Sequence, residues 1–271
     1  MPYNGKLQAE SWKKLKIGEN MFSKANVKIQ ELAKHPDLKT FLENRRKIYS
    51  FDLISGHSCP FADKCLSKVI IVDGRRKIVD GRNTEYRCFS ASQEALLTNV
   101  YNKRSRNFEL LRHRTTDQMR ELICGAMPIN LGICRIHVAG DFFNRKYFRA
   151  WLQVAESNPD RLFYAYTKSL PYWLDNLGNI PDNMILTASY GGRCDQLIHQ
   201  LNLRSAIVVY SYEQAEQLGL EVDHDDSHAA NPLTKDQDFA LMIHGPQPAG
   251  SEASAATSEL KKQGRKFSYS R

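Results

Sequence analysis

The sequence predicts an α/β protein, and it favours a full or partial (βα) barrel with parallel strands over an open doubly wound sheet. Apolar, β-branched runs alternate with helical stretches over the second half of the chain. These runs are apolar almost throughout, which is typical of strands covered on both faces. Neighbouring strands begin roughly 15 to 30 residues apart, a spacing typical of short βα repeats. Together with an earlier strand at 48–54, the alternation predicts about seven strands.

The first half of the chain predicts helices, one strand and an insertion. Residues 24–48 have a helical pattern that breaks at His35-Pro36, because proline disfavours helix in the residue before it. The run "IYSFDLI" (48–54) predicts the first strand. The run "KVIIVDGRRKIVDG" predicts a hairpin with glycine turns, and residues 90–124 predict a helical region without Gly or Pro. We therefore expect a hairpin and helical insertion over about 66–130.

The second half predicts alternating strands and helices. The helix after the strand at 134–140 is amphipathic, with one apolar face made by Tyr147, Phe148, Trp151, Leu152 and Ala155. The other expected strands lie at 161–169, 183–192, 205–212, 220–223 and 238–245. The other expected helices lie at 170–177, 194–202 and 213–219. The pattern predicts a single domain over 1–244, and the Ser- and Ala-rich segment 245–271 predicts a flexible tail.

The charge of the chain is strongly basic, with a net charge of +8 and a pI of about 9.1. Basic clusters occur at 45–47, 75–77, 103–106 and 112–114. Such a surface attracts nucleic acid by counterion release, or it is simply a solvated surface. No secretion signal and no apolar run of membrane-spanning length is present. We therefore expect a cytoplasmic protein whose thiols stay reduced, which argues against disulfides.

The carboxyl ends of the predicted strands carry small and polar residues. In a βα barrel the active site lies at these ends, in the loops that follow the strands. The first strand leads into Cys59, the second into Gly140 and Asp141, the third into Lys168, and the fourth into Ser189. Because several ends agree, Gly140, Asp141, Lys168 and Ser189 are the predicted cofactor-binding residues.

Three cysteines predict a metal site. Cys59 and Cys65 leave the first strand in "SGHSCPFADKCLSK", and Cys88 follows the hairpin in "EYRCFSASQEA". Thiolates are good ligands for zinc and for iron–sulfur clusters, and three of them leave one metal position open. Cys134 and Cys194 are candidates for a fourth ligand, although Cys134 begins a strand and so is expected at the opposite end.

A second candidate site is the acidic loop "DHDDSH" (223–228). Its carboxylates and imidazoles suit a divalent metal or general acid–base chemistry. Asp225 and His228 are the predicted catalytic residues of this loop. The alternative is a solvated acidic loop without chemistry.

The chain resembles two known groups. A strand leading into a cysteine loop, then "IHVAGDFF", then a helix and "LFYAYTKS", resembles the core of radical S-adenosylmethionine enzymes over 49–65 and 134–222. That resemblance implies a four-iron cluster on Cys59, Cys65 and Cys88, with S-adenosylmethionine contacting the turn at Gly140 and Asp141. The usual loop of those enzymes has three and then two residues between its cysteines, whereas the gaps here are five and 22. Most of the chain also resembles an uncharacterised phage family named for gene product 88, through "SGHSCPFADKCLSK", "YRCFSASQEA", "RIHVAGDFF", "YAYTKS", "DDSHAA" and "FALMIHGPQPAGS".

Three functional hypotheses follow from these patterns. The first is a phage-encoded radical S-adenosylmethionine-like enzyme with a [4Fe-4S] cluster on the three cysteines. The second is a nucleic-acid-binding protein with zinc at the same cysteines, whose basic residues, chiefly Arg104 to Arg114, contact phosphates. The third is a metal-dependent hydrolase that uses Asp225 and His228. The substrate and the oligomeric state do not follow from the sequence.

Overall fold

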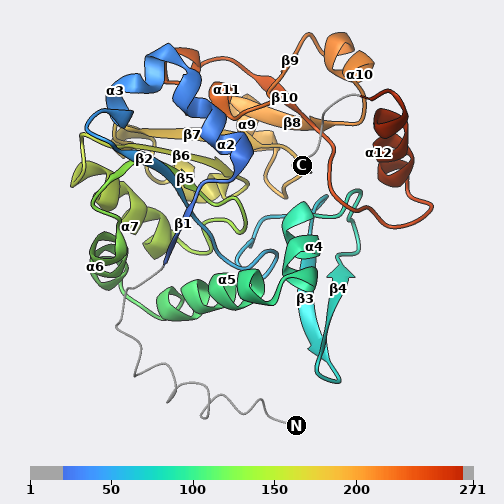
Figure 1. Ribbon diagram of the computed structural model, residues 1–271, viewed down its shortest axis with the longest axis horizontal. Helices are drawn as coiled ribbons and strands as arrows, with labels where there is room; N and C mark the ends of the chain where they lie inside the picture. The colour runs from blue at the N-terminus through green and yellow to red at the C-terminus, as the bar shows by residue number, and fades with distance from the viewer. Residues whose placement is uncertain (1–20, 265–271) are drawn as a thin grey trace.

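An eight-stranded, mostly parallel sheet forms the centre of the computed structural model, which describes residues 21–264 (Figure 1). The strand order is β1-β2-β5-β6-β7-β8-β10-β9, and every pair is parallel except β1 with β2. In this order the strands are Phe22–Lys24, Lys47–Phe51, Leu131–Ile136, Leu162–Thr167, Met184–Ser189, Ser205–Val209, Phe239–Met242 and Glu221–Val222. The predicted α/β class with parallel strands is confirmed.

The sheet is open along its edges, so closure into a full barrel is not shown. The edge strands β1 and β9 do not pair with each other within residues 21–264. The order also departs from a simple barrel at one edge, because β10 lies between β8 and β9. Strand β1 was not predicted, since its three residues were too few to stand out from the helical pattern that follows.

Helices cover both faces of the sheet. Helices α6 (Thr116–Ala126) and α7 (Arg145–Glu156) pack on one face, in a core that includes Cys134 and Ile136 of β5. The opposite face is covered by α2 (Val27–Gln30), the 3-10 helices Glu31–Lys34 and Pro36–Leu38, α3 (Lys39–Leu42) and α11 (Ser227–Ala230). Every residue of β5 is buried, as expected for a strand covered on both sides.

Helix α7 confirms the predicted amphipathic face. The Asn144 side chain accepts a hydrogen bond from the Tyr147 backbone N–H, which caps the first turn. All five predicted face residues are buried, and Trp151 packs edge-on against Phe51 and Phe22. Helix α7 thereby fixes strand β2 and the start of the cysteine loop that follows it.

Between β2 and β5 the chain forms a hairpin followed by helices. Strands β3 (Ser67–Val72) and β4 (Arg75–Asp80) form a separate antiparallel pair that projects from the body (Figure 1). The turn between them has positive φ at Asp73 and Gly74. Helices α4 (Phe89–Leu96) and α5 (Thr98–Leu111) follow it, and α4 packs against the hairpin.

The C-terminal segment differs from the predicted flexible tail. Residues Glu252–Lys262 form helix α12, which Ser251 caps and which buries Ala253 and Leu260 against the β10 region. The Ser and Ala content that predicted flexibility serves here as a cap and as small packing residues. Residues 265–271 lie outside the described part. The remaining helices are α8 (Leu170–Leu174), the 3-10 helices Leu177–Asn179 and Pro232–Thr234, α9 (Gln196–Gln200) and α10 (Tyr212–Gln217).

The described helices include none with the length and apolar character needed to cross a membrane.

Candidate functional site

A cavity of about 600 Å³ opens at the carboxyl edge of the parallel strands. Its walls come from the loop after β2, from the ends of β5, β6, β7 and β10, and from the residues around β9. All seven predicted metal- and cofactor-binding residues line it: Cys59, Cys65, Cys88, Gly140, Asp141, Lys168 and Ser189. Cavities at this edge are the usual ligand sites of parallel α/β proteins.

The cysteine loop spans the mouth of the sheet from β2 to β7. The backbone N–H groups of Asp63 and Lys64 both donate to Gly191 O, and Ala62 forms an isolated bridge with Gly192. Gly191 follows β7, so the loop crosses over the ends of β5 and β6. This crossing is what places Cys59 and Cys65 against the same cavity as Asp141 and Lys168.

Cys88 lies after the hairpin, directly before helix α4, and lines the cavity. Its backbone N–H donates to Ser67 Oγ at 3.2 Å, which ties the start of α4 to the start of β3. Burial and, next, the charge of Cys65 raise the pKa of the Cys88 thiol to about 11. Burial is also the main cause that raises the pKa of Cys59 well above its ordinary value, and the charges of Asp141, Cys88 and Cys65 raise it as well. The thiols of Cys59 and Cys88 are therefore protonated at neutral pH.

The thiols are not gathered into a closed ligand set. Within residues 21–264, no group of three or more His, Cys, Asp and Glu side chains is arranged to hold a metal ion. The candidates for a fourth ligand, Cys134 and Cys194, do not line the cavity. Cys134 is fully buried in the core beside α7, because its strand places it away from the carboxyl edge.

Asp141 fixes the turn between β5 and the loop after it. Its carboxylate accepts hydrogen bonds from Phe142 N at 2.7 Å, Thr167 Oγ1 at 2.6 Å and Lys168 N at 2.9 Å. Burial raises the pKa of Asp141 in spite of these bonds. Since both carboxylate oxygens are bonded within the protein, Asp141 shapes the cavity and holds the ends of β5 and β6 together.

Lys168 joins the next two strand ends. Its ammonium donates to Ser189 Oγ at 2.6 Å, Tyr190 O at 2.7 Å and Ser189 O at 3.3 Å. The side chain is buried, with 8% of its surface exposed. Lys168 therefore brings a positive charge to the cavity wall while it anchors the end of β7.

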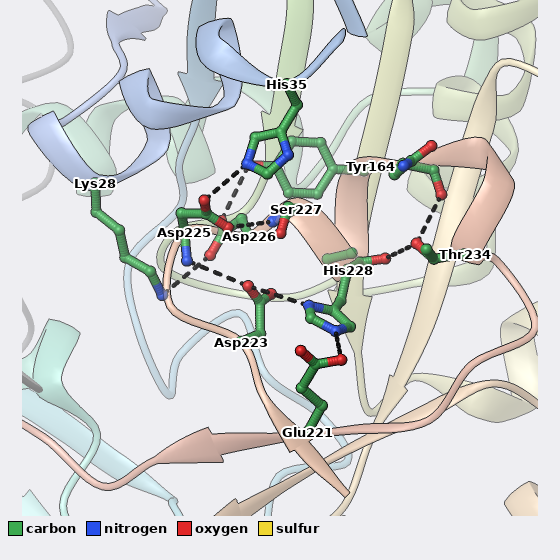
Figure 2. A network of polar contacts seen from close by, with 12 residues as sticks. Lys28, His35, Tyr164, Glu221, Asp223, Asp225, Asp226, Ser227, His228 and Thr234 are labelled. Atoms are coloured by element: carbon green, nitrogen blue, oxygen red, sulfur yellow. Dashed lines mark hydrogen bonds and ion pairs between the residues drawn. The ribbon is translucent and has the colours of Figure 1, made fainter. Parts of the chain in front are cut away.

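A buried ionic network, absent from the sequence prediction, lies beside the cavity. Arg135 of β5 donates to Asp226. Asp226 also accepts from Tyr164 Oη at 3.0 Å and pairs with Lys28 Nζ at 3.3 Å (Figure 2). Burial would raise the pKa of Asp226, but Arg135 and Lys28 hold it below its ordinary value. Arg135, Lys28 and Asp226 line the cavity. The signal that could have found them is an arginine inside the apolar strand "CRIHVAG".

Asp225 and His228, the predicted catalytic pair, do not line the cavity. Asp225 accepts from Ser227 N and lies 2.8 Å from His35 Nε2 (Figure 2). Burial would raise its pKa, but the bonds from Ser227 and His35 lower it to about 2. His228 Nε2 lies 3.2 Å from Glu221, and Asp223 is the main cause of the raised pKa of His228. Both groups are engaged in structural contacts; their neighbours Asp223, His224 and Asp226 face the cavity instead.

Two cavity histidines are held neutral. Burial lowers the pKa of His137 to about 3 and that of His244 to about 4. In the unfolded chain both have a pKa of about 6.5, so below that pH the unfolded state takes up protons that the folded state does not. The stability that these neutral histidines contribute to the folded state is fully present above about pH 6.5. It is lost as the pH falls toward about 4 for His244 and about 3 for His137.

The unfolding free energy should therefore fall steeply under mild acid. Each histidine contributes a slope of up to about 1.4 kcal/mol per pH unit between about pH 6 and pH 5. The variant His244→Phe should show about half of the combined wild-type slope, because Phe does not titrate. Denaturant unfolding at both pH values measures this. Parallel pH profiles for the two proteins would contradict it.

The prediction that the stretch from Arg104 to Arg114 contacts phosphates is wrong for Arg104. Arg104 is buried, and it donates to Glu94 at 3.1 Å and to Gln93 at 3.2 Å. Glu94 in turn accepts from Ser55 Oγ at 2.6 Å at the start of the cysteine loop. Arg104 thus supports the loop instead of facing solvent. Arg112, which follows α5, pairs with Glu109 on the surface.

Comparison with protein families identifies one match. The family model described as Gene product 88 matches residues 17–264. Searches of curated proteins and of solved structures found no match. No comparison supports the resemblance to radical S-adenosylmethionine enzymes. Since the match spans most of the chain, the protein belongs to the gene product 88 family.

Proposed function

We propose that the protein is a metal-dependent enzyme that transforms a ligand in the cavity at the carboxyl edge of the sheet. In this proposal an iron–sulfur cluster is held by Cys59, Cys65 and Cys88, as in a radical S-adenosylmethionine-like enzyme. The observation that carries it is that these three of the chain's six cysteines line one cavity together with Asp141 and Lys168.

The donor set suits such a group in its chemistry, because thiols and a carboxylate line the same cavity wall. The charges of Asp141, Cys88 and Cys65 raise the pKa of Cys59, and the charge of Cys65 raises that of Cys88. Their anions repel one another there, so a bound cation would stabilise the thiolates and release their protons. The side chains are not gathered to coordinating distance in the described residues. The proposal therefore requires that Cys59, Cys65 and Cys88 close around the metal when it binds.

The cluster, if bound with one iron free of protein ligands, would supply a single electron to S-adenosylmethionine and so start radical chemistry. The chain's own residues would bind and enclose that ligand. Gly140 lets the loop after β2 pack closely against the cavity wall, because a Cβ there would lie 2.6 Å from Ser58 Oγ. Ser189 presents a hydroxyl held by Lys168. Arg135 and Lys28 bring positive charge to the ionic part of the cavity, which suits a ligand carboxylate.

Metal analysis on anaerobically prepared protein tests the proposal. Reconstituted protein should be brown and hold about four iron and four sulfide per chain, the content of a [4Fe–4S] cluster. The variants Cys59→Ser, Cys65→Ser and Cys88→Ser should each lose most of the iron. The control Cys124→Ser, a half-buried thiol on α6, should keep it.

Protein that stays colourless and free of iron after reconstitution would refute the cluster. About one zinc per chain at the same cysteines would replace it with the alternative, a structural zinc. Neither outcome depends on knowing the substrate. The hydrolase hypothesis is not carried forward, because Asp225 and His228 lie in structural contacts away from the cavity.

A further inference from the structure

The hairpin β3–β4 has one face on which cations alternate with aliphatic side chains. Its register pairs Lys68 with Val79, Ile70 with Lys77, and Val72 with Arg75. Partners in an antiparallel pair point to the same side, and alternate residues of a strand share a face. All six side chains therefore lie on one face, and each cross-strand pair joins one cation with one aliphatic group. We call these six residues the hairpin face.

The opposite side of the hairpin is occupied by the protein itself. There Arg76 donates to Ala95 O at 3.1 Å and to Thr98 Oγ1 at 2.8 Å, and helix α4 packs against both strands. On the hairpin face Ile70 is 37% exposed and Val79 is 47% exposed, and on the opposite side Ile71, near the tip, is 48% exposed. An isolated two-stranded hairpin is only marginally stable in water. Exposed apolar side chains grouped on one face of such a hairpin are typical of a surface that contacts a partner.

The cations of the hairpin face are not neutralised. Among residues 21–264, no ion pair engages Lys68, Arg75 or Lys77. The acidic residue of β4, Asp80, belongs to the opposite side and pairs with Arg87. Other basic clusters of the chain are partly paired, as Arg46 is with Asp160 and Arg104 is with Glu94. The hairpin face therefore carries three positive charges that no ion pair engages within residues 21–264.

We propose that the hairpin face binds the phosphate backbone of a nucleic acid. Three unpaired cations on a chain of net charge +8 complement a polyanion. A strand of six residues extends about 20 Å, enough to follow several successive phosphates, and a two-stranded ribbon fits the major groove of a duplex. The aliphatic side chains between the cations would contact sugars and base edges.

The hairpin is rooted in the wall of the cavity. Its first strand begins two residues after Cys65, and its second strand is joined through Asp80 to Arg87, the neighbour of Cys88. Cys65, Arg87 and Cys88 line the cavity. A nucleic acid on the hairpin face would thus lie beside the cavity opening. The further step, that a nucleotide is the substrate class of the cavity, rests on the proposed function.

Fluorescence anisotropy with the full-length protein tests the binding. The probes are a labelled DNA duplex of about 20 base pairs and a single-stranded RNA of the same sequence, each titrated at several salt concentrations. We expect binding that weakens steeply with salt, and a preferred probe that identifies which nucleic acid is the source of the phosphates. The double variant Arg75→Gln/Lys77→Gln should bind about 10- to 100-fold more weakly, with a salt slope lower by about two.

The matched control is Lys39→Gln/Lys261→Gln, which removes two exposed cations from α3 and α12. This control should bind within about twofold of the wild type, because nonspecific charge loss alone has a small effect. No binding of either probe at low salt, or equal weakening in both double variants, would overturn the proposal. Iron content, measured on the same samples, should be unchanged in Arg75→Gln/Lys77→Gln. Failure of nucleic-acid binding is thereby separated from failure of the metal site.

Discussion

Replacing Asp226 by Asn should lower the free energy of unfolding by about 3 to 5 kcal/mol, the usual cost of breaking a buried ion pair. Asp226 is 1% exposed, and its carboxylate faces both Arg135 and Lys28. Asn keeps the size of the side chain and tolerates the positive φ of 68° at this position. The variant therefore removes the negative charge with little change in shape, and it leaves the Arg135 charge buried without its partner.

The neighbouring Asp225→Asn is the matched control. Asp225 pairs with His35 across side chains that are 27% and 34% exposed, so water screens the pair. We expect its loss to cost about 1 to 2 kcal/mol, because the pKa of Asp225 is lowered to about 2 but water screens part of the interaction. Denaturant unfolding at neutral pH compares the two variants. Equal losses would mean that the Asp226 network contributes no more than a surface contact.

The strands and the position of the site were predictable because both depend on local sequence. Apolar runs such as "CRIHVAG" and "LFYAYTKS" identify buried strands, and the residues after them meet at one edge of a parallel sheet. This reasoning selected Cys59, Asp141, Lys168 and Ser189, which come from four strand ends and line one cavity. The pattern of polar residues at strand ends was more informative than any single motif.

What escaped prediction depends on contacts between distant parts of the chain. The insertion of β10 between β8 and β9 is a long-range pairing that no local pattern encodes. Arg104 lies in a basic stretch that looks solvated, and only the fold places it against Glu94 and the cysteine loop. Asp225 and Asp226 are adjacent in sequence, yet the Asp225 side chain is 27% exposed and Asp226 is buried between two cations. The sequence pattern identified the loop 223–228, but it did not show that Asp226, and not Asp225, lines the cavity.

The variant Gly140→Ala should lower the free energy of unfolding by about 3 kcal/mol or more, because Gly140 lies close to the loop after β2. Gly140 has a φ of 90°, which costs an L-residue about 1 to 2 kcal/mol. A Cβ there would also lie 2.7 Å from Leu53 Cβ and 2.6 Å from Ser58 Oγ. Overlap of this kind adds about 1 to 3 kcal/mol, since backbone and side chains must shift.

The control Gly250→Ala separates the two causes. Gly250 has a similar φ of 79°, but a Cβ there meets nothing within 4 Å, so only the cost of about 1 to 2 kcal/mol for the backbone conformation should remain. Leu53 and Ser58 belong to the loop that carries Cys59, so Gly140→Ala should also shift this loop, whereas Gly250→Ala should not. Similar losses of stability in the two variants, measured by denaturant unfolding, would show that the loop after β2 yields easily. The cavity wall would then deform at low energetic cost at the point where the cysteine loop crosses the end of β5.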